Sequence, residues 1–131
     1  MNVAVETGEG VYTIDPENEQ VVDFVPGAEL SETSQPRVDL PLLVAAAAEG
    51  STVVALLDRR PPLAVSHDAG SSWREAGGGL PPGRAIAIAE DDPDRMLYAA
   101  AHRVYVSGDG GRFWRALEAE LPEIKRVGWL D

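Results

Sequence analysis

One eight-residue pattern occurs twice in the chain, and its spacing constrains the fold more than any other feature. Residues 66–73 and 107–114 share Ser-x-Asp-x-Gly-x-x-Trp, and every shared position is offset by 41 residues. The same offset aligns strand-like segments further upstream, such as Ala45 with Ile86 and Val127. A period near 40 with strand-like content is typical of β-propeller blades. The pattern therefore predicts an all-β fold built from repeated four-stranded units.

Two of these units are complete. The second blade is expected at about residues 38–80 and the third at about residues 84–121, each with four short strands between Gly- and Asp-rich turns. Propensity alone favours a helix over Ala45–Ala48, but the alignment with Ile86 and Val127 predicts a strand there.

The first unit begins at its second strand. Val3–Val5 aligns with Met96–Tyr98 after allowance for an insertion, which we place in an exposed loop at Ala28–Arg37. The missing first strand is then found at the other end of the chain, in Ile124–Leu130. The first blade is therefore expected at about residues 1–27 together with 124–130, and the three blades form a single domain over residues 1–131.

Three blades span too small an arc to close a ring, because propellers close with about four to eight. Two copies would supply six blades, with the C-terminal strand of one chain completing the N-terminal blade of the other. We therefore expect a homodimer that forms through its blade faces and through exchange of this strand. The alternatives are a single chain whose open faces another protein covers, and a compact three-bladed wedge.

The composition limits the kinds of partner that the chain is expected to bind. There are 11 basic and 22 acidic residues, a net charge of −11, so a nucleic-acid partner is not expected. Ten arginines accompany a single lysine, which suits either adaptation to high salt or a GC-rich genome. The chain has no cysteine, and we see neither a membrane-length apolar run nor a leader, so we expect a cytoplasmic protein without membrane attachment, cofactor or metal.

The repeated octapeptide has a local physical explanation and a family resemblance. The aspartate suits a tight turn that accepts backbone hydrogen bonds, the glycine allows positive φ, and the tryptophan packs on the sheet. The octapeptide resembles the Asp-box, also called the bacterial neuraminidase repeat, of certain β-propellers. That resemblance implies a structural role, remote from the ligand face, for Ser66, Asp68, Gly70, Trp73, Ser107, Asp109, Gly111 and Trp114.

Function is expected on the loops opposite the boxes. These loops carry six basic side chains that form a candidate ligand face: Arg37, Arg59, Arg60, Arg84, His102 and Arg103. Nearby acids could neutralise them. We expect a non-catalytic interaction or scaffold module that binds a protein or ligand there, and the alternative is a binder of an anionic small molecule or glycan. A sialidase-like hydrolase is the weakest hypothesis, because no catalytic residue set can be assigned and Tyr12, Tyr98 and Tyr105 fall inside expected strands.

Overall fold

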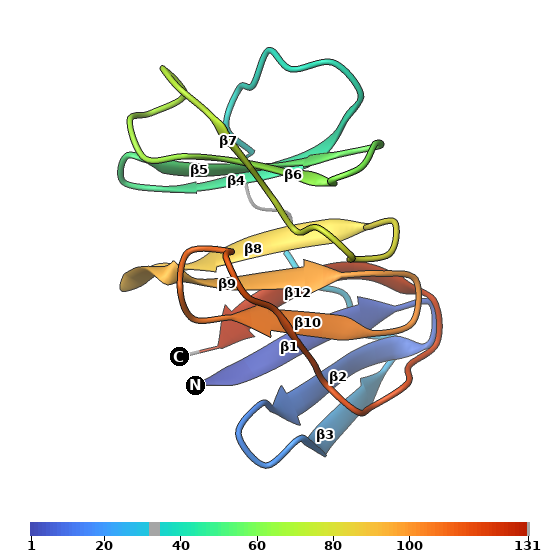
Figure 1. The fold of residues 1–131 in the computed structure, drawn as a ribbon. Coiled ribbons are helices and arrows are strands. Elements are labelled where there is room, and N and C mark those ends of the chain that lie inside the picture. The colour runs from blue at the N-terminus through green and yellow to red at the C-terminus, as the bar shows by residue number, and fades with distance from the viewer. Residues whose placement is uncertain (32–34, 131) are drawn as a thin grey trace.

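The computed structural model describes residues 1–31 and 35–130, which form twelve strands (Figure 1). The strands are β1 (Asn2–Thr7), β2 (Gly10–Asp15), β3 (Gln20–Pro26), β4 (Leu43–Glu49), β5 (Thr52–Leu57), β6 (Leu63–Ser66), β7 (Arg74–Ala76), β8 (Ala85–Ala89), β9 (Asp92–Ala99), β10 (Val104–Ser107), β11 (Arg115–Ala116) and β12 (Ile124–Leu130). The strand predicted over the alanine-rich run is confirmed as β4.

The strands make three four-stranded antiparallel sheets, as the repeat predicts. The first sheet has the order β12-β1-β2-β3, the second β4-β5-β6-β7 and the third β8-β9-β10-β11. Within each sheet every neighbouring pair runs antiparallel.

The position of β12 corrects the expected strand exchange. It pairs with β1 of the same chain, with Asn2 opposite Leu130 and Val5 opposite Val127, so the two termini lie side by side (Figure 1). The short connection after β11 delivers β12 directly to the edge of β1. An intramolecular partner at this high effective concentration removes the need for a strand from another copy.

The three sheets stack with the third in the middle, since β8 contacts both β12 and β4. Side chains alternate across each strand, so Val3 and Val5 point towards the third sheet while Ala4 and Glu6 point away from it. Two apolar cores result. One packs Val3, Val5 and Ile14 against the third sheet, and the other packs Leu56 and its neighbours in the second sheet against Met96 and Tyr98.

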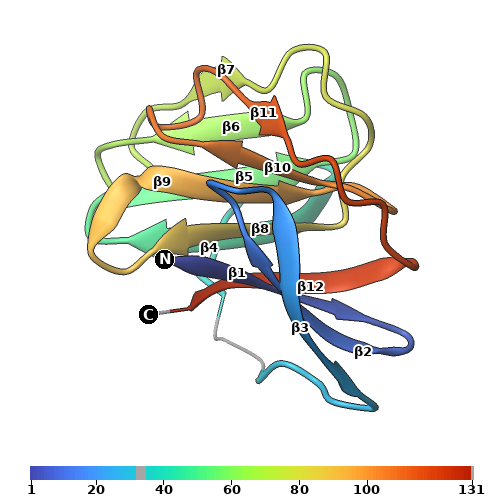
Figure 2. The ribbon, with the colours of Figure 1, turned by 90° about the horizontal axis from the view of Figure 1, so that it is seen from below.

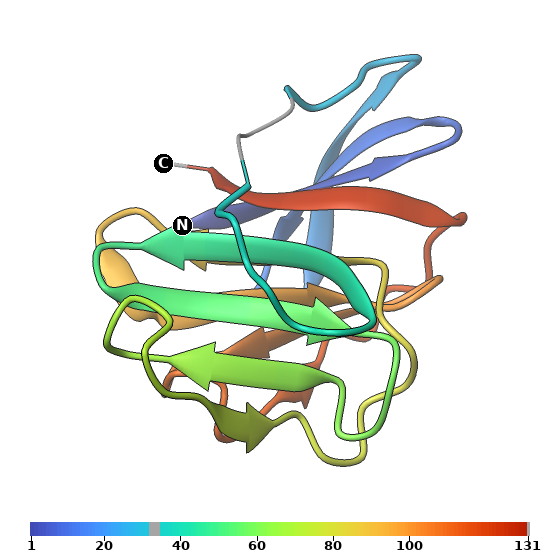
Figure 3. The same ribbon diagram turned by 90° about the horizontal axis from the view of Figure 1, so that it is seen from above.

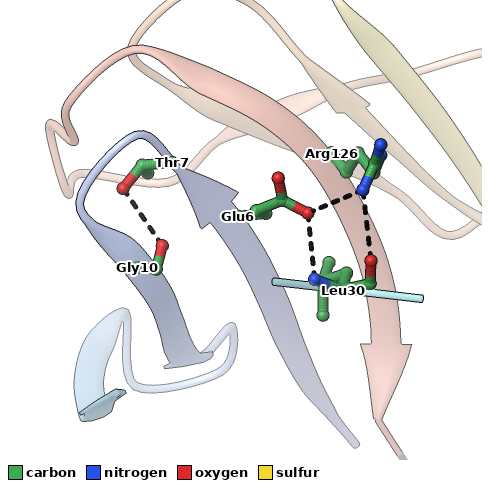
Figure 4. Close-up of polar contacts among 5 residues, drawn as sticks. All are labelled: Glu6, Thr7, Gly10, Leu30 and Arg126. Atoms are coloured by element: carbon green, nitrogen blue, oxygen red, sulfur yellow. Dashed lines mark hydrogen bonds and ion pairs between the residues drawn. The ribbon is translucent and has the colours of Figure 1, made fainter. Parts of the chain in front are cut away.

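The segment between β3 and β4, called the crossing segment, begins beside the first sheet and ends over the second (Figure 1). Near its start, the carboxylate of Glu6 accepts the backbone N–H of Leu30 at 2.9 Å and the guanidinium of Arg126 at 3.1 Å (Figure 4). Arg126 also donates to the carbonyl of Leu30. Part of the loop expected at Ala28–Arg37, residues 32–34, lies outside the described residues.

The end of the same segment lies over the outward face of the second sheet (Figures 1 and 3). Val38 and Leu40 pack there against a small cluster made by Ala55, Leu57 and Ala64. The expectation that this face stays open is therefore wrong. The alternating apolar residues of the segment cover the side chains that a neighbouring sheet would otherwise bury.

Candidate functional site

The two repeated loops are held by hydrogen bonds to their aspartates. The carboxylate of Asp68 accepts the Ser66 and Ser72 hydroxyls at 2.7 and 2.6 Å and the Ser72 backbone N–H at 2.8 Å. These bonds, led by the Ser72 hydroxyl, lower the pKa of Asp68 to about 2. Gly70 completes the turn at φ +91°, where a side chain would be strained.

The loop of the third sheet repeats this arrangement. Asp109 accepts the backbone N–H of Phe113 at 3.0 Å and the Ser107 hydroxyl at 2.8 Å, and these two contacts lower its pKa. Gly111 stands at φ +88°. Both carboxylates are thus occupied by hydrogen bonds within their own turns.

The arginine after the tryptophan of each repeated octapeptide links neighbouring sheets. Arg74, which follows Trp73, donates to the carbonyl of Gly110 in the third sheet. Arg115, which follows Trp114, donates to the carbonyl of Pro16 in the first sheet at 3.0 Å. The 41-residue repeat therefore places equivalent inter-sheet contacts at the end of the stack that carries the repeated octapeptides, remote from the candidate ligand face.

The loops that carry the candidate basic residues gather at the other end of the sheets, on the right of Figure 1. Backbone bonds join them: Leu121 donates to the carbonyl of His102, and Ile124 to that of Ala101. The ring of His102 lies 3.0 Å from the carbonyl of Leu121. Arg37, by contrast, belongs to the crossing segment, next to the Val38 that covers the second sheet.

Acidic side chains neutralise three of the candidate arginines. Arg59 pairs with Glu75 and Arg84 with Glu123, both at 2.7 Å, and Arg103 lies 3.5 Å from Glu120. The ion pair with Arg84 lowers the pKa of Glu123. These pairs are exposed, so each adds little stability, but they remove the positively charged patch that the sequence suggested. Arg60 forms no ion pair among the described residues.

A cavity of about 170 Å³ opens on this loop end, between the start of β4 and the connection from β7 to β8. It is lined by Val44, Leu57, Asp58, Arg59, Arg60, Pro62, Leu80, Pro82 and Gly83. Beside it, Leu42, Leu43 and Val44 expose 59%, 39% and 46% of their surface, which is unusual for three consecutive large apolar residues. The sequence pointed to Arg59 and Arg60 but not to the apolar lining. Pro81-Pro82-Gly83 was the signal for a rigid turn there.

One wall of the cavity is fixed by Tyr98. This side chain is fully buried, and its hydroxyl donates to the carbonyl of Pro81 at 2.6 Å. Gly83 lies so close that an added Cβ would stand 2.6 Å from the phenol ring. Burial raises the pKa of Tyr98 to about 12, so this hydroxyl is a structural donor, unsuited to act as a nucleophile.

Comparison with known proteins finds no matching family model and no matching curated protein. Among solved structures, YCF48 bound to D1 peptide matches 88% of this chain and 36% of its own, with 19% sequence identity and a TM-score of 0.50. The fold is that of a β-propeller. The crystal structure of the GH74 enzyme of Niastella koreensis, also a propeller protein, matches 92% of this chain and 18% of its own, with 20% identity and a TM-score of 0.49. The chain thus spans well under half the length of either propeller.

The described residues hold neither a cluster suited to a metal ion nor a helix suited to a membrane. Within residues 1–31 and 35–130, no three His, Asp or Glu side chains come together in a group that could hold a metal ion. Over the same residues there is no helix of the length and apolarity that crossing a membrane requires.

Proposed function

We propose that the chain is a non-catalytic interaction module of the Asp-box propeller type, which binds a segment of a partner protein at the loop end. One observation carries this proposal. The cavity of about 170 Å³ is lined by Val44, the last residue of the exposed apolar run Leu42–Val44, so exposed apolar surface adjoins the cavity. Interfaces are commonly anchored by one buried side chain surrounded by such a rim.

The size of the cavity favours a side chain over a free ligand. Small-molecule sites typically enclose about 300–1,000 Å³, whereas this cavity has about 170 Å³, enough for one large apolar side chain. The paired arginines further weaken the alternative, an anionic small molecule or glycan. We expect the bound segment to place an apolar side chain against Val44 and Leu80 and a carboxylate near Arg60.

One solved neighbour is consistent with this proposal. YCF48 is seen with a peptide bound, so a propeller of related fold can serve peptide recognition. A sialidase-like activity gains no support, since Tyr98 is buried and bonded to Pro81. A cytoplasmic location stays a prediction from the sequence.

The repeat also supports the proposal that two copies close one six-bladed ring. In such a ring the outward face of the second sheet would pack on the partner's first sheet. Val38 and Leu40 would then have to leave Ala55 and Leu57, on which they now pack. Light scattering distinguishes the monomer from a ring of two copies, and a monodisperse monomer at high concentration refutes the ring.

The test of partner binding uses peptides selected from a displayed random library on the immobilised chain. A selected peptide is synthesised, and its affinity is measured by fluorescence anisotropy for wild type, Val44→Asp and Arg60→Glu. Phe113→Asp is the matched control, because Phe113 is 79% exposed on a box loop at the other end of the sheets. We expect each loop-end variant to weaken binding at least tenfold and the control to bind as wild type does.

Binding that is unchanged in Val44→Asp and Arg60→Glu would place the peptide elsewhere and refute the proposed site. If the selected peptides share acidic residues but no apolar residue beside them, the result would instead favour the alternative function, the binding of an anionic small molecule or glycan.

A further inference from the structure

The outermost strand differs between the three sheets. In the second and third sheets it is short and begins with arginine: β7 has three residues and β11 has two. In the first sheet it is β3, with seven residues and no basic side chain. β3 lies at the rim of the stack, paired only with β2 (Figures 1 and 2).

All seven residues of β3 are exposed, including four large apolar ones. Val21, Val22, Phe24 and Val25 have 45%, 53%, 37% and 48% of their surface accessible. They occupy successive positions on both faces of the strand, so no single covering element would bury them all. A strand added along the free edge would contact both faces at once.

Proteins normally protect edge strands by shortening them or by placing charges on them, because an unpaired edge is a template for another strand. The second and third sheets show both devices, whereas β3 has seven residues and its one charged side chain is Asp23, with Pro26 at its end. We propose that β3 is a docking edge, to which a partner protein adds one antiparallel strand by main-chain hydrogen bonding.

The charges around β3 specify the chemistry of that strand. Asp23 is exposed in its middle, Glu17 is exposed before it, and Glu9 and Glu29 are exposed at its far end, where Gly27 donates to the carbonyl of Glu9. Arg115, which donates to the carbonyl of Pro16 in the β2–β3 turn, is paired with Glu19 at 3.2 Å. The edge therefore fits an extended apolar segment that carries lysine or arginine in its middle and at its ends.

A second copy of this chain is a poorer fit. Antiparallel pairing of two β3 strands would bring the acidic residues of each next to those of the other. The docking edge lies apart from the loop-end cavity and does not depend on the function proposed above.

The experiment uses two decapeptides with blocked termini, and in both of them valine occupies every second position. The positions between the valines hold threonine and lysine in one peptide, and threonine and glutamate in the other. Affinity is measured by fluorescence anisotropy, and the binding site by the amide shifts and hydrogen exchange of the ¹⁵N-labelled full chain. The variants are Val22→Lys, which places a positive charge on the edge, and Asp23→Lys, which inverts its central charge. Phe113→Lys is the control, because it also replaces an exposed apolar residue by lysine but lies outside β3.

We expect the lysine peptide to bind wild type and Phe113→Lys alike, with slowed exchange confined to β3. Val22→Lys should weaken it at least tenfold, and Asp23→Lys should reverse the preference in favour of the glutamate peptide. The inference is overturned if neither peptide protects β3 amides, or if Asp23→Lys leaves the preference unchanged. It is also overturned if the wild-type chain self-associates and Val22→Lys abolishes this, since that result would assign the edge to a second copy.

Discussion

Replacement of Tyr98 by phenylalanine should make the protein less stable at neutral pH and more stable at high pH. The side chain is fully buried, and its hydroxyl holds the carbonyl of Pro81 at 2.6 Å. At pH 7 the variant loses that hydrogen bond, which costs about 1 kcal/mol within a range of about 0.5–1.5 kcal/mol. The ring remains, so no large cavity is added to this cost.

The pH dependence has the opposite sign. Burial raises the pKa of Tyr98 from 10.0 to about 12 in the folded protein. The unfolded chain therefore loses this proton first, and stability falls as pH rises from 10 through 12. The full loss is about 2.7 kcal/mol, since each pKa unit corresponds to about 1.4 kcal/mol. Phenylalanine has no such proton and escapes this loss.

The two effects cancel at one pH, which the experiment can locate. With a hydrogen-bond contribution of about 1 kcal/mol, the stability curves of wild type and Tyr98→Phe should cross near pH 10.7, and between about pH 10.1 and 11.1 for the stated range. The free energy of unfolding is measured by urea denaturation at steps between pH 7 and 11.5. Tyr12→Phe, in the first sheet, gives the baseline for removing a phenol hydroxyl away from Pro81. Parallel curves for wild type and Tyr98→Phe would refute the assignment of a buried, bonded hydroxyl.

Three further predictions follow from local contacts. Gly83→Ala should destabilise the fold by about 1–3 kcal/mol in urea denaturation, because its Cβ would stand 2.6 Å from Tyr98 and 2.7 Å from Leu56, whereas Gly78→Ala, with nothing within 4 Å, should not. Asp68→Asn should flatten the acid-unfolding curve followed by circular dichroism. The carboxylate, with its pKa lowered from 3.8 to about 2, stabilises the fold above pH 3.8, and this contribution is lost as pH falls towards 2. Val38→Asp with Leu40→Asp should expose the cluster of Ala55, Leu57 and Ala64 and increase binding of a hydrophobic dye, while Asp39→Asn should leave dye binding unchanged.

The repeat predicted the strands and their grouping well because it carries information over the whole chain. Alanine-rich β4 illustrates this, since propensity favours a helix there and only the alignment with β8 and β12 indicates a strand. The sheet partner of residues 124–130 followed from the same register. The register does not specify whether that partner belongs to the same chain, because it describes positions in a sheet and not the path of the connection.

The sequence could not predict which of the candidate arginines form ion pairs, because their acidic partners come from other parts of the fold. Glu123, which pairs with Arg84, is separated from it by the whole third sheet along the chain, and only the stacking of the loops brings the two together. The covering of the second sheet was predictable in part. Val38 and Leu40 alternate with polar residues, a pattern typical of an extended segment with one buried side.

The first and second sheets lie at the two ends of the stack, and each has an outward face on which no further sheet packs. Different parts of the chain cover these two faces, and this difference determines where partners are expected. On the second sheet, Val38 and Leu40 take the place of a neighbour. On the first sheet, the outward face carries the ion pair of Glu6 and Arg126 and the irregular segment at Leu30, which supply polar contacts instead of an apolar surface. The faces that a ring would join are thus already occupied, while β3 and the rim at Leu42–Val44 remain exposed and apolar. Hydrophobic burial on association should therefore be gained mainly at these two surfaces, so a partner that binds either one should leave the crossing segment in place.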